Sequence, residues 1–245
     1  ILPYYSVIGG WVIKYFAVFL TGGGSASAAD DYFTNFVGST FEPLGWFLLF
    51  LGATAVIVLL GVEKGIEKVS KFAMPILVLL AVVISIYCLT LDGAMDGLAY
   101  YVQPHMDDFS VKTVLSAMGQ LFYSMSLAMG IMVTYGSYMR KDTNLESSVR
   151  QIEVFDTVIA FLAGLMIIPA VFVFSGGDPK ILQSGPSLMF VILPKVFASM
   201  PMGGAIGAAF FLLVIFAALT SSISLMETIV SIFRDKFHWS RKNAC

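Results

Sequence analysis

Long apolar segments alternate with short polar ones along most of the chain. A helix needs about 20 apolar residues to cross the hydrocarbon core of a bilayer, and several segments approach that length. They are too long and too evenly apolar for the alternating strands of a transmembrane barrel, and helices satisfy their own backbone hydrogen bonds in lipid. The pattern therefore predicts transmembrane helices at about 1–20, 45–62, 72–91, 113–139, 152–174 and 204–233.

Composition excludes a water-soluble domain. Hydrophobic residues make up 58% of the chain and charged residues only 12%, whereas soluble domains carry about 25% charged residues. A soluble protein of this composition would expose a largely apolar surface that aggregates in water. The fold class we predict is all-α, a polytopic transmembrane helical bundle.

Lysine and arginine are concentrated in alternate connections, and this bias sets the orientation of the spans. Cationic connections face the cytoplasm, so the links after the second and fourth spans and the tail after the sixth are predicted to be cytoplasmic. Those segments contain Lys64, Lys68, Lys71, Arg140, Lys141, Arg150, Arg234, Lys236, Arg241 and Lys242, against Lys112, Lys180 and Lys195 in the other links.

The link between the fifth and sixth spans is apolar but too short to cross a membrane. Pro194 divides it, and proline interrupts a helix because it lacks the backbone N–H. We expect residues 176–203 to form a re-entrant hairpin on the outer face, where irregular backbone can be buried in protein. The alternative is a helix that lies on the membrane surface.

The fourth span has a polar middle, with Ser124 and Ser126 between Gly119 and Gly130. A helix broken at this point would leave backbone groups free to line a cavity, and half-helix ends can hold a substrate carboxylate and a sodium ion. The alternative is that the serines hydrogen-bond between packed helices, which is common for small polar residues. The pattern alone favours that alternative.

The sixth span contains three consecutive hydroxyl residues, Thr220, Ser221 and Ser222. Hydroxyl and carbonyl oxygens suit a small hard cation such as sodium. Glu227, in the same span, is costly in lipid and should face a wet vestibule or a partner. Asp156, near the start of the fifth span, carries the same argument, unless it lies within the headgroup layer.

Several motifs together resemble the neurotransmitter:sodium symporter family, in particular its bacterial amino-acid transporters. They are Y-Y-S-V-I-G-G-W, G-Q-L-F-Y-S-M-S-L-A-M-G, T-Y-G-S-Y-M-R-K-D, A-A-L-T-S-S-I-S and S-R-K-N-A. The resemblance covers essentially the whole chain, in order. It implies a fold of twelve helices with two inverted repeats, of which this chain would hold helices three to eight, with the fourth span broken near residues 124–128.

The resemblance also implies roles for particular residues. Asp156 reaches its matching position only with a one-residue shift, and its added charge favours chloride independence. Met129 stands where an aromatic residue is common, which leaves a pliable pocket wall. The implied substrate-binding residues are Tyr5, Tyr123, Ser124, Ser126, Met129, Ser221 and Leu225; the first sodium site uses Ser124 and Asp156, the second uses Ala217, Thr220 and Ser221, and the cytoplasmic gate uses Tyr138 and Asp235.

The function implied is a sodium-coupled symporter in a bacterial inner membrane. It would import a neutral, hydrophobic or aromatic amino acid by alternating access, with sodium as the coupling ion, no other cofactor and no nucleic-acid partner. One alternative is an intramembrane enzyme with Asp156 or Glu227 as general base, although no paired His or Cys accompanies either residue. The other is a membrane scaffold that transports nothing.

Overall fold

The computed structural model describes residues 1–104, 106, 109–178 and 185–245. Within these ranges every regular element is a helix, which confirms the all-α prediction. The elements in chain order are α1 (Leu2–Leu20), α2 (Gly24–Ser27), α3 (Tyr32–Gly38), α4 (Glu42–Leu59), the π-helix η1 (Val62–Glu67), α5 (Lys68–Leu89), α6 (Ala94–Val102), α7 (Val111–Ser124), α8 (Ile131–Tyr138), α9 (Leu145–Ser175), η4 (Leu188–Ile192), α10 (Leu193–Ser199), α11 (Gly203–Phe237) and α12 (Arg241–Ala244).

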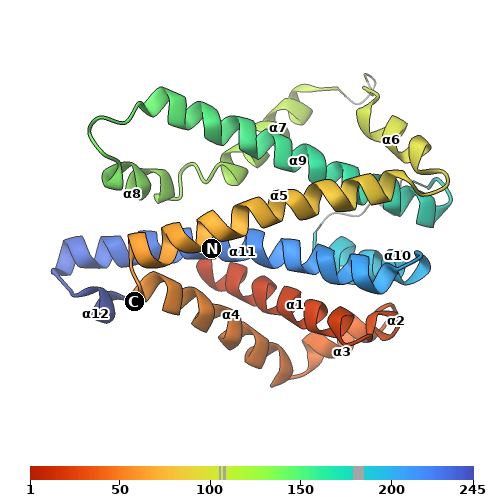
Figure 1. Cartoon of the computed structure of the whole chain (residues 1–245), viewed down its shortest axis with the longest axis horizontal. Helices are drawn as coiled ribbons and strands as arrows, with labels where there is room; N and C mark the ends of the chain where they lie inside the picture. The colour runs from red at the N-terminus through yellow and green to blue at the C-terminus, as the bar shows by residue number, and fades with distance from the viewer. Residues whose placement is uncertain (105, 107–108, 179–184) are drawn as a thin grey trace.

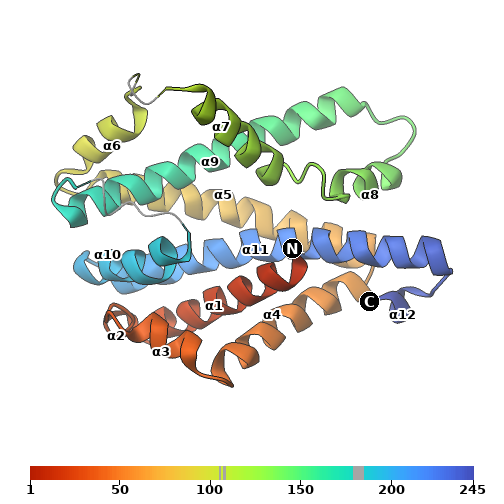
Figure 2. The same ribbon diagram turned by 180° about the vertical axis from the view of Figure 1, so that it is seen from behind.

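The long helix α11 runs through the middle of the bundle. Figure 1 shows α1 and α4 on one side of it and α5 with α9 on the other, and Figure 2 shows the same order from behind. The largest buried cluster joins α1, α5, α9, η4, α10 and α11, with Tyr15, Phe190 and Phe211 among its fully buried side chains. Burial of such rings removes large apolar areas from solvent, so this cluster fixes the positions of the helices that surround the candidate site.

Four of the described helical segments are long and apolar enough to cross a membrane: Glu42–Leu59, Val62–Leu89, Leu145–Ser175 and Gly203–Phe237. The 19-residue α1 falls outside this set because Tyr4, Tyr5, Ser6 and Lys14 dilute its apolar sequence. The fourth predicted span is outside it because α7 and α8 are separate short helices.

The long helix α9 continues past both ends expected from hydropathy. α9 was expected from residue 152, but it begins at Leu145, where the side chain of Asn144 accepts a hydrogen bond from the Ser147 N–H at 3.1 Å. This cap satisfies one of the donors that a helix start leaves free. The polar first turns of α9 therefore extend beyond the apolar segment.

Small and hydroxyl-bearing residues allow α1, α4 and α11 to approach closely. A β-carbon added at Gly10 would lie 2.7 Å from the backbone nitrogen of Phe47, so only glycine fits where α1 crosses α4. Thr54 on α4 donates to Ser222 on α11 at 3.2 Å, and both side chains are fully buried. The Ser222 hydroxyl therefore faces α4.

The segment predicted as an outer hairpin contains the short helices η4 and α10. Residues 179–184, including Lys180, lie outside the described residues. The Tyr15 hydroxyl donates to the Phe190 carbonyl at 2.8 Å, and Lys195 forms an ion pair with Asp30 in the connection after α2. These contacts hold η4 and α10 against α1 and the α2–α3 connection. A re-entrant position relative to the membrane stays a prediction.

Candidate functional site

The fourth predicted span is divided into two helices. α7 ends at Ser124 and α8 begins at Ile131, while the prediction placed the break near residues 124–128. In the connecting segment, residues 125–130, three residues have left-handed φ: Ser126 at 56°, Ala128 at 63° and Gly130 at 78°. Such a conformation costs a non-glycine residue roughly 1–2 kcal/mol. The backbone therefore leaves the helical path here at an energetic cost, as functional segments often do.

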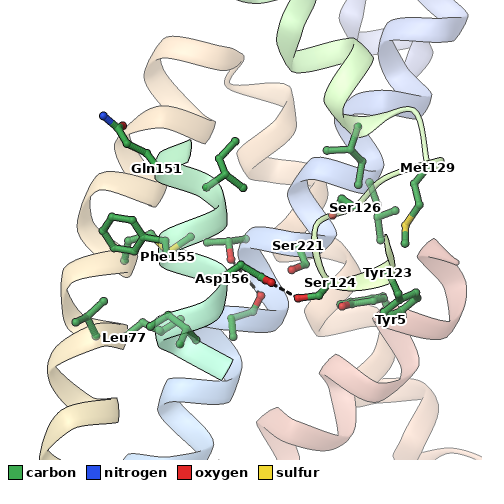
Figure 3. A pocket seen from close by; sticks show the side chains of 18 of the residues that line it. Tyr5, Leu77, Tyr123, Ser124, Ser126, Met129, Gln151, Phe155, Asp156 and Ser221 are labelled. Atoms are coloured by element: carbon green, nitrogen blue, oxygen red, sulfur yellow. Dashed lines mark hydrogen bonds between the residues drawn. The ribbon is translucent and has the colours of Figure 1, made fainter. Parts of the chain in front are cut away.

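A cavity of about 830 Å³ lies beside this break and is lined by residues of α1, α5, α7, α8, α9 and α11. Figure 3 shows side chains from several of these helices pointing into it. The structure brings together every residue predicted for the substrate pocket and the two sodium sites, and their individual roles stay predictions. The lining includes Tyr5, Tyr123, Ser124, Ser126, Met129, Asp156, Ala217, Thr220, Ser221 and Leu225.

A second cavity of about 310 Å³ adjoins the first and shares Tyr5, Tyr123 and Ser221 with it. Met189 of η4 also lines it. The predicted outer hairpin therefore covers the side of the site on which the two tyrosines lie.

A side-chain hydrogen bond joins the end of α7 to α9. The Ser124 hydroxyl donates to the carboxylate of Asp156, as Figure 3 shows. Both residues line the large cavity, so a hydroxyl and a carboxylate oxygen lie next to each other there. Oxygen ligands of this kind suit hard cations. The assignment of Asp156 to the first sodium site stays a prediction.

A second set of oxygens lies on α11. The Thr220 hydroxyl donates to the carbonyls of Phe216 at 3.0 Å and Ala217 at 3.1 Å. Because the single hydroxyl proton is used by the helix backbone, the lone pairs of Thr220 Oγ1 are available to a cation. Ala217, Thr220 and Ser221 all line the cavity, so this face of α11 offers oxygen ligands.

Glu227 on α11 is fully buried and has three side-chain hydrogen bonds. Arg241 of α12 donates to its two carboxylate oxygens at 2.7 and 2.8 Å, and the Tyr138 hydroxyl donates to it at 2.7 Å. Arg241 also donates to the Val58 carbonyl near the end of α4 at 2.8 Å. The hydrogen bonds to Glu227 raise the pKa of Arg241 above its ordinary value.

Sequence reasoning expected a partner for Glu227 but did not identify Arg241. The chain reverses after α11, where His238 takes a left-handed φ of 56°, and this reversal brings Arg241 back to Glu227. The sequence signals for Arg241 were its place among the predicted cytoplasmic cations and within the S-R-K-N-A motif, and neither pointed to Glu227. Asp235, predicted for the gate with Tyr138, is exposed and forms no ion pair within the described part of the chain, so its gate role stays a prediction.

Comparison with known proteins identifies relatives over the whole chain. The model of the Sodium:neurotransmitter symporter family matches residues 35–244. The uncharacterized sodium-dependent transporter YhdH of Bacillus subtilis is 38% identical over 98% of this chain and 54% of its own length. An uncharacterized sodium-dependent transporter of Haemophilus influenzae is 34% identical over 100% of this chain and 54% of its own.

A solved structure is also similar. The crystal structure of MhsT in complex with L-phenylalanine matches with a TM-score of 0.87 and 42% identity, over 99% of this chain and 55% of that one. The chain thus spans about half the length of the relatives it matches.

Proposed function

Since the chain belongs to the sodium:neurotransmitter symporter family, we propose that it forms one side of the binding site of a sodium-coupled amino-acid symporter. The observation that carries the proposal is the break between α7 and α8 beside a cavity of about 830 Å³. A helix interrupted at membrane depth leaves backbone groups and half-helix ends that bind ions and solutes. Bacterial relatives support placement in a bacterial inner membrane.

The substrate we propose is a neutral amino acid with a hydrophobic or aromatic side chain. Tyr123, Met129 and Leu225 give the cavity an apolar wall, and methionine can adapt to side chains of different shape. The Tyr5 hydroxyl would hold the substrate carboxylate. The similar transporter MhsT was crystallised with L-phenylalanine, which supports a substrate of this class.

Two sodium ions would couple transport to the ion gradient. The first would bind between Ser124 and Asp156, with the substrate carboxylate as a further ligand, so that ion and substrate favour each other's binding. The second would bind the α11 oxygens of Ala217, Thr220 and Ser221. The carboxylate of Asp156 supplies a fixed negative charge beside the first ion, and we expect transport to be independent of chloride.

The described helices provide only part of each site. None of the residues of α7 is buried, although this helix carries Tyr123 and Ser124. In the full-length protein, whose relatives are nearly twice as long as this chain, further helices would supply the remaining ligands. Transport is therefore proposed for the full-length protein, which would alternate between states of different ligand affinity.

The two alternative functions receive less support. The family is one of symporters, and the carboxylate of Glu227 is occupied by Arg241 and Tyr138, so it is poorly placed to act as a general base. A scaffold that binds nothing would not need a break with two left-handed non-glycine residues.

Uptake of radiolabelled L-phenylalanine by the full-length protein in liposomes tests the proposal. We expect uptake to require an inward sodium gradient and to continue when chloride is replaced by gluconate. Tyr5→Phe should raise the amino-acid KM about tenfold, the effect of a hydrogen bond of about 1.4 kcal/mol to a charged group. Tyr32→Phe, on α3 and outside the lining of both cavities, is the control. Uptake that is equal in sodium and potassium would contradict the proposal.

A further inference from the structure

Two tyrosines one helical turn apart on α8 contact two residues one turn apart on α11. The Tyr135 hydroxyl lies 2.9 Å from Ser224 Oγ, and the Tyr138 hydroxyl donates to Glu227 at 2.7 Å. The Tyr138–Glu227 contact belongs to the Glu227–Arg241 cluster. The Tyr135–Ser224 contact lies nearer along α11 to the oxygens of the second sodium site, and none of the roles assigned so far involves it.

The direction of the Tyr135–Ser224 hydrogen bond follows from the protons available. Ser224 Oγ donates its only proton to the carbonyl of Thr220 at 3.0 Å. A serine hydroxyl has one donor and two acceptor lone pairs, so at this contact Tyr135 must be the donor. The result is a directed chain from Tyr135 through Ser224 to the Thr220 carbonyl, and hydrogen bonds in such chains polarise and strengthen one another.

This chain enters a longer row of hydroxyls on α11. Thr228 donates to the Ser224 carbonyl at 2.9 Å, Ser224 to the Thr220 carbonyl, and Thr220 to the Phe216 carbonyl at 3.0 Å. Side-chain bonds to the carbonyl four residues earlier compete with the helix ladder and bend it. The row therefore sets the local curvature of α11 where Thr220 and Ser221 line the cavity. Ser224 is the member that α8 contacts.

We propose that Tyr135 is a positioning residue for the second sodium site. By holding the Ser224 proton on the Thr220 carbonyl, it fixes the turn of α11 that presents the Thr220 and Ser221 hydroxyls to the ion. Binding sites need their ligands held to within about 0.5 Å, so a small change in this turn weakens sodium binding. The proposal rests on the proposed function, since it assumes that sodium binds here.

The proposal also links the ion to the movement of α8. If the Tyr135–Ser224 contact strengthens sodium binding, bound sodium strengthens the contact by the same factor. Sodium at the second site would then favour states in which α8 is packed on α11. Through the Tyr135–Ser224 hydrogen bond, the packing of α8 on α11 would therefore depend on whether sodium is bound.

The test measures the sodium half-saturation of L-phenylalanine binding to the full-length protein at saturating amino acid. Tyr135→Phe keeps the ring and removes the hydroxyl, and Ser224→Ala removes the middle of the chain. We expect each to raise the half-saturation about tenfold, the lower end of the effect on metal affinity of changing a residue that orients the metal ligands. The double variant should be no worse than the more affected single variant, because both remove the same connection.

Ser222→Ala is the matched control, because it removes a hydroxyl of the same helix whose contact is with Thr54 on α4. It should lower thermal stability without moving the sodium half-saturation. In Tyr135→Phe, the rise in melting temperature caused by sodium should shrink while the melting temperature without sodium changes little, which a purely structural role would not produce.

The outcomes separate this inference from the proposed function. A parent-like sodium half-saturation in Tyr135→Phe, or effects of the two single variants that multiply in the double variant, would overturn the positioning role alone. A parent protein that binds the amino acid equally without sodium would contradict the proposed function as well.

Discussion

α7 and α8 come from one predicted span, but the described bundle holds them in different ways. α7 buries none of its residues. Near its end, Ser124 hydrogen-bonds to Asp156 of α9, and Tyr123 lies beside Tyr5 of α1. Its start is stabilised locally, by a capping box in which Ser110 and Thr113 bond to each other's backbone. α8 buries Ile131 and Thr134 and is bonded to α11 through two tyrosines.

The difference indicates which half of the site this chain completes. α8 has its polar partners within the described chain, and Arg241 extends that network to the end of α4. α7 has a capped start but buries none of its residues, and we expect lipid or further segments of the full-length protein to cover it. Substitutions near α8 should therefore act on stability, and those near α7 on ligand binding.

The largest stability effect is expected where α8 is held. Glu227→Gln removes the charge that compensates Arg241, and breaking a buried ion pair by removing one partner costs about 3 kcal/mol. We expect a clear loss in melting temperature of the full-length protein in detergent. Asp235→Asn, eight positions along the same helix but exposed, should change stability by less than about 0.5 kcal/mol. Equal losses in the two variants would mean that the buried Glu227–Arg241 pair contributes no more to stability than an exposed carboxylate, and would contradict this expectation.

At the α7 end, the expected effect is on ligand binding and not on folding. Asp156→Asn keeps the side-chain shape but removes the charge, and a hydrogen bond to a charged group is worth about 1.5–3 kcal/mol. The sodium half-saturation for amino-acid binding should rise at least about tenfold, with a melting temperature close to that of the parent. Glu153→Gln, on an exposed part of the same helix, is the control. If Asp156→Asn lost much stability without a change in sodium dependence, the α7 end would act on folding and not on ligand binding, contrary to this expectation.

The joint between the two half-helices should be strained. Ala128→Gly relieves a left-handed φ that costs alanine roughly 1–2 kcal/mol, while the added freedom of the unfolded chain offsets about 0.4–1 kcal/mol. We expect a small net gain in the free energy of unfolding. Ala160→Gly within the helix α9 should instead lose about 1 kcal/mol. If both variants lose stability equally, the strain at Ala128 is not real.

The smallest effect on stability is expected at the predicted outer hairpin, where Lys195 of α10 forms an ion pair with Asp30. The hydrogen bond from Lys195 lowers the pKa of Asp30. The pKa of Asp30 is lower in the folded state than in the unfolded state, where it is about 3.9. The ion pair with Lys195 therefore stabilises the fold at pH values above about 3.9, and this stabilisation is lost as the pH falls through the folded-state pKa of Asp30. Hydrogen exchange of α10 amides should show a small acid-induced loss of protection that is absent in Asp30→Asn. An identical pH profile in both proteins would mean that the Asp30–Lys195 ion pair does not stabilise α10.

Hydropathy predicted the apolar core of each long helix but not its ends. It placed the fifth span at 152–174, whereas α9 covers Leu145–Ser175, because hydropathy reports contact with lipid and a capped helix continues beyond it. The break after Ser124 was not the favoured interpretation of the pattern itself, since serines between packed helices give the same pattern. Family resemblance supplied that prediction.

The residues of the cavity were predictable because most of them lie in the motifs that carry the family resemblance, and the structure brings them together. The Glu227–Arg241 pair was not predictable in the same way. It depends on a chain reversal at His238 and on the length of α11, and neither is encoded in a local pattern. The Tyr135–Ser224 contact likewise depends on how α8 is rotated against α11.

We propose above that the cavity at the α7–α8 break binds sodium together with an amino acid. The most direct test is a sodium titration of L-phenylalanine binding to the full-length protein and to two neighbouring serine variants. Ser221 lines the cavity, and Ser222 faces α4. We predict that Ser221→Ala raises the sodium half-saturation about tenfold while Ser222→Ala leaves it unchanged. Equal sodium dependence in both variants and the parent would contradict the claim.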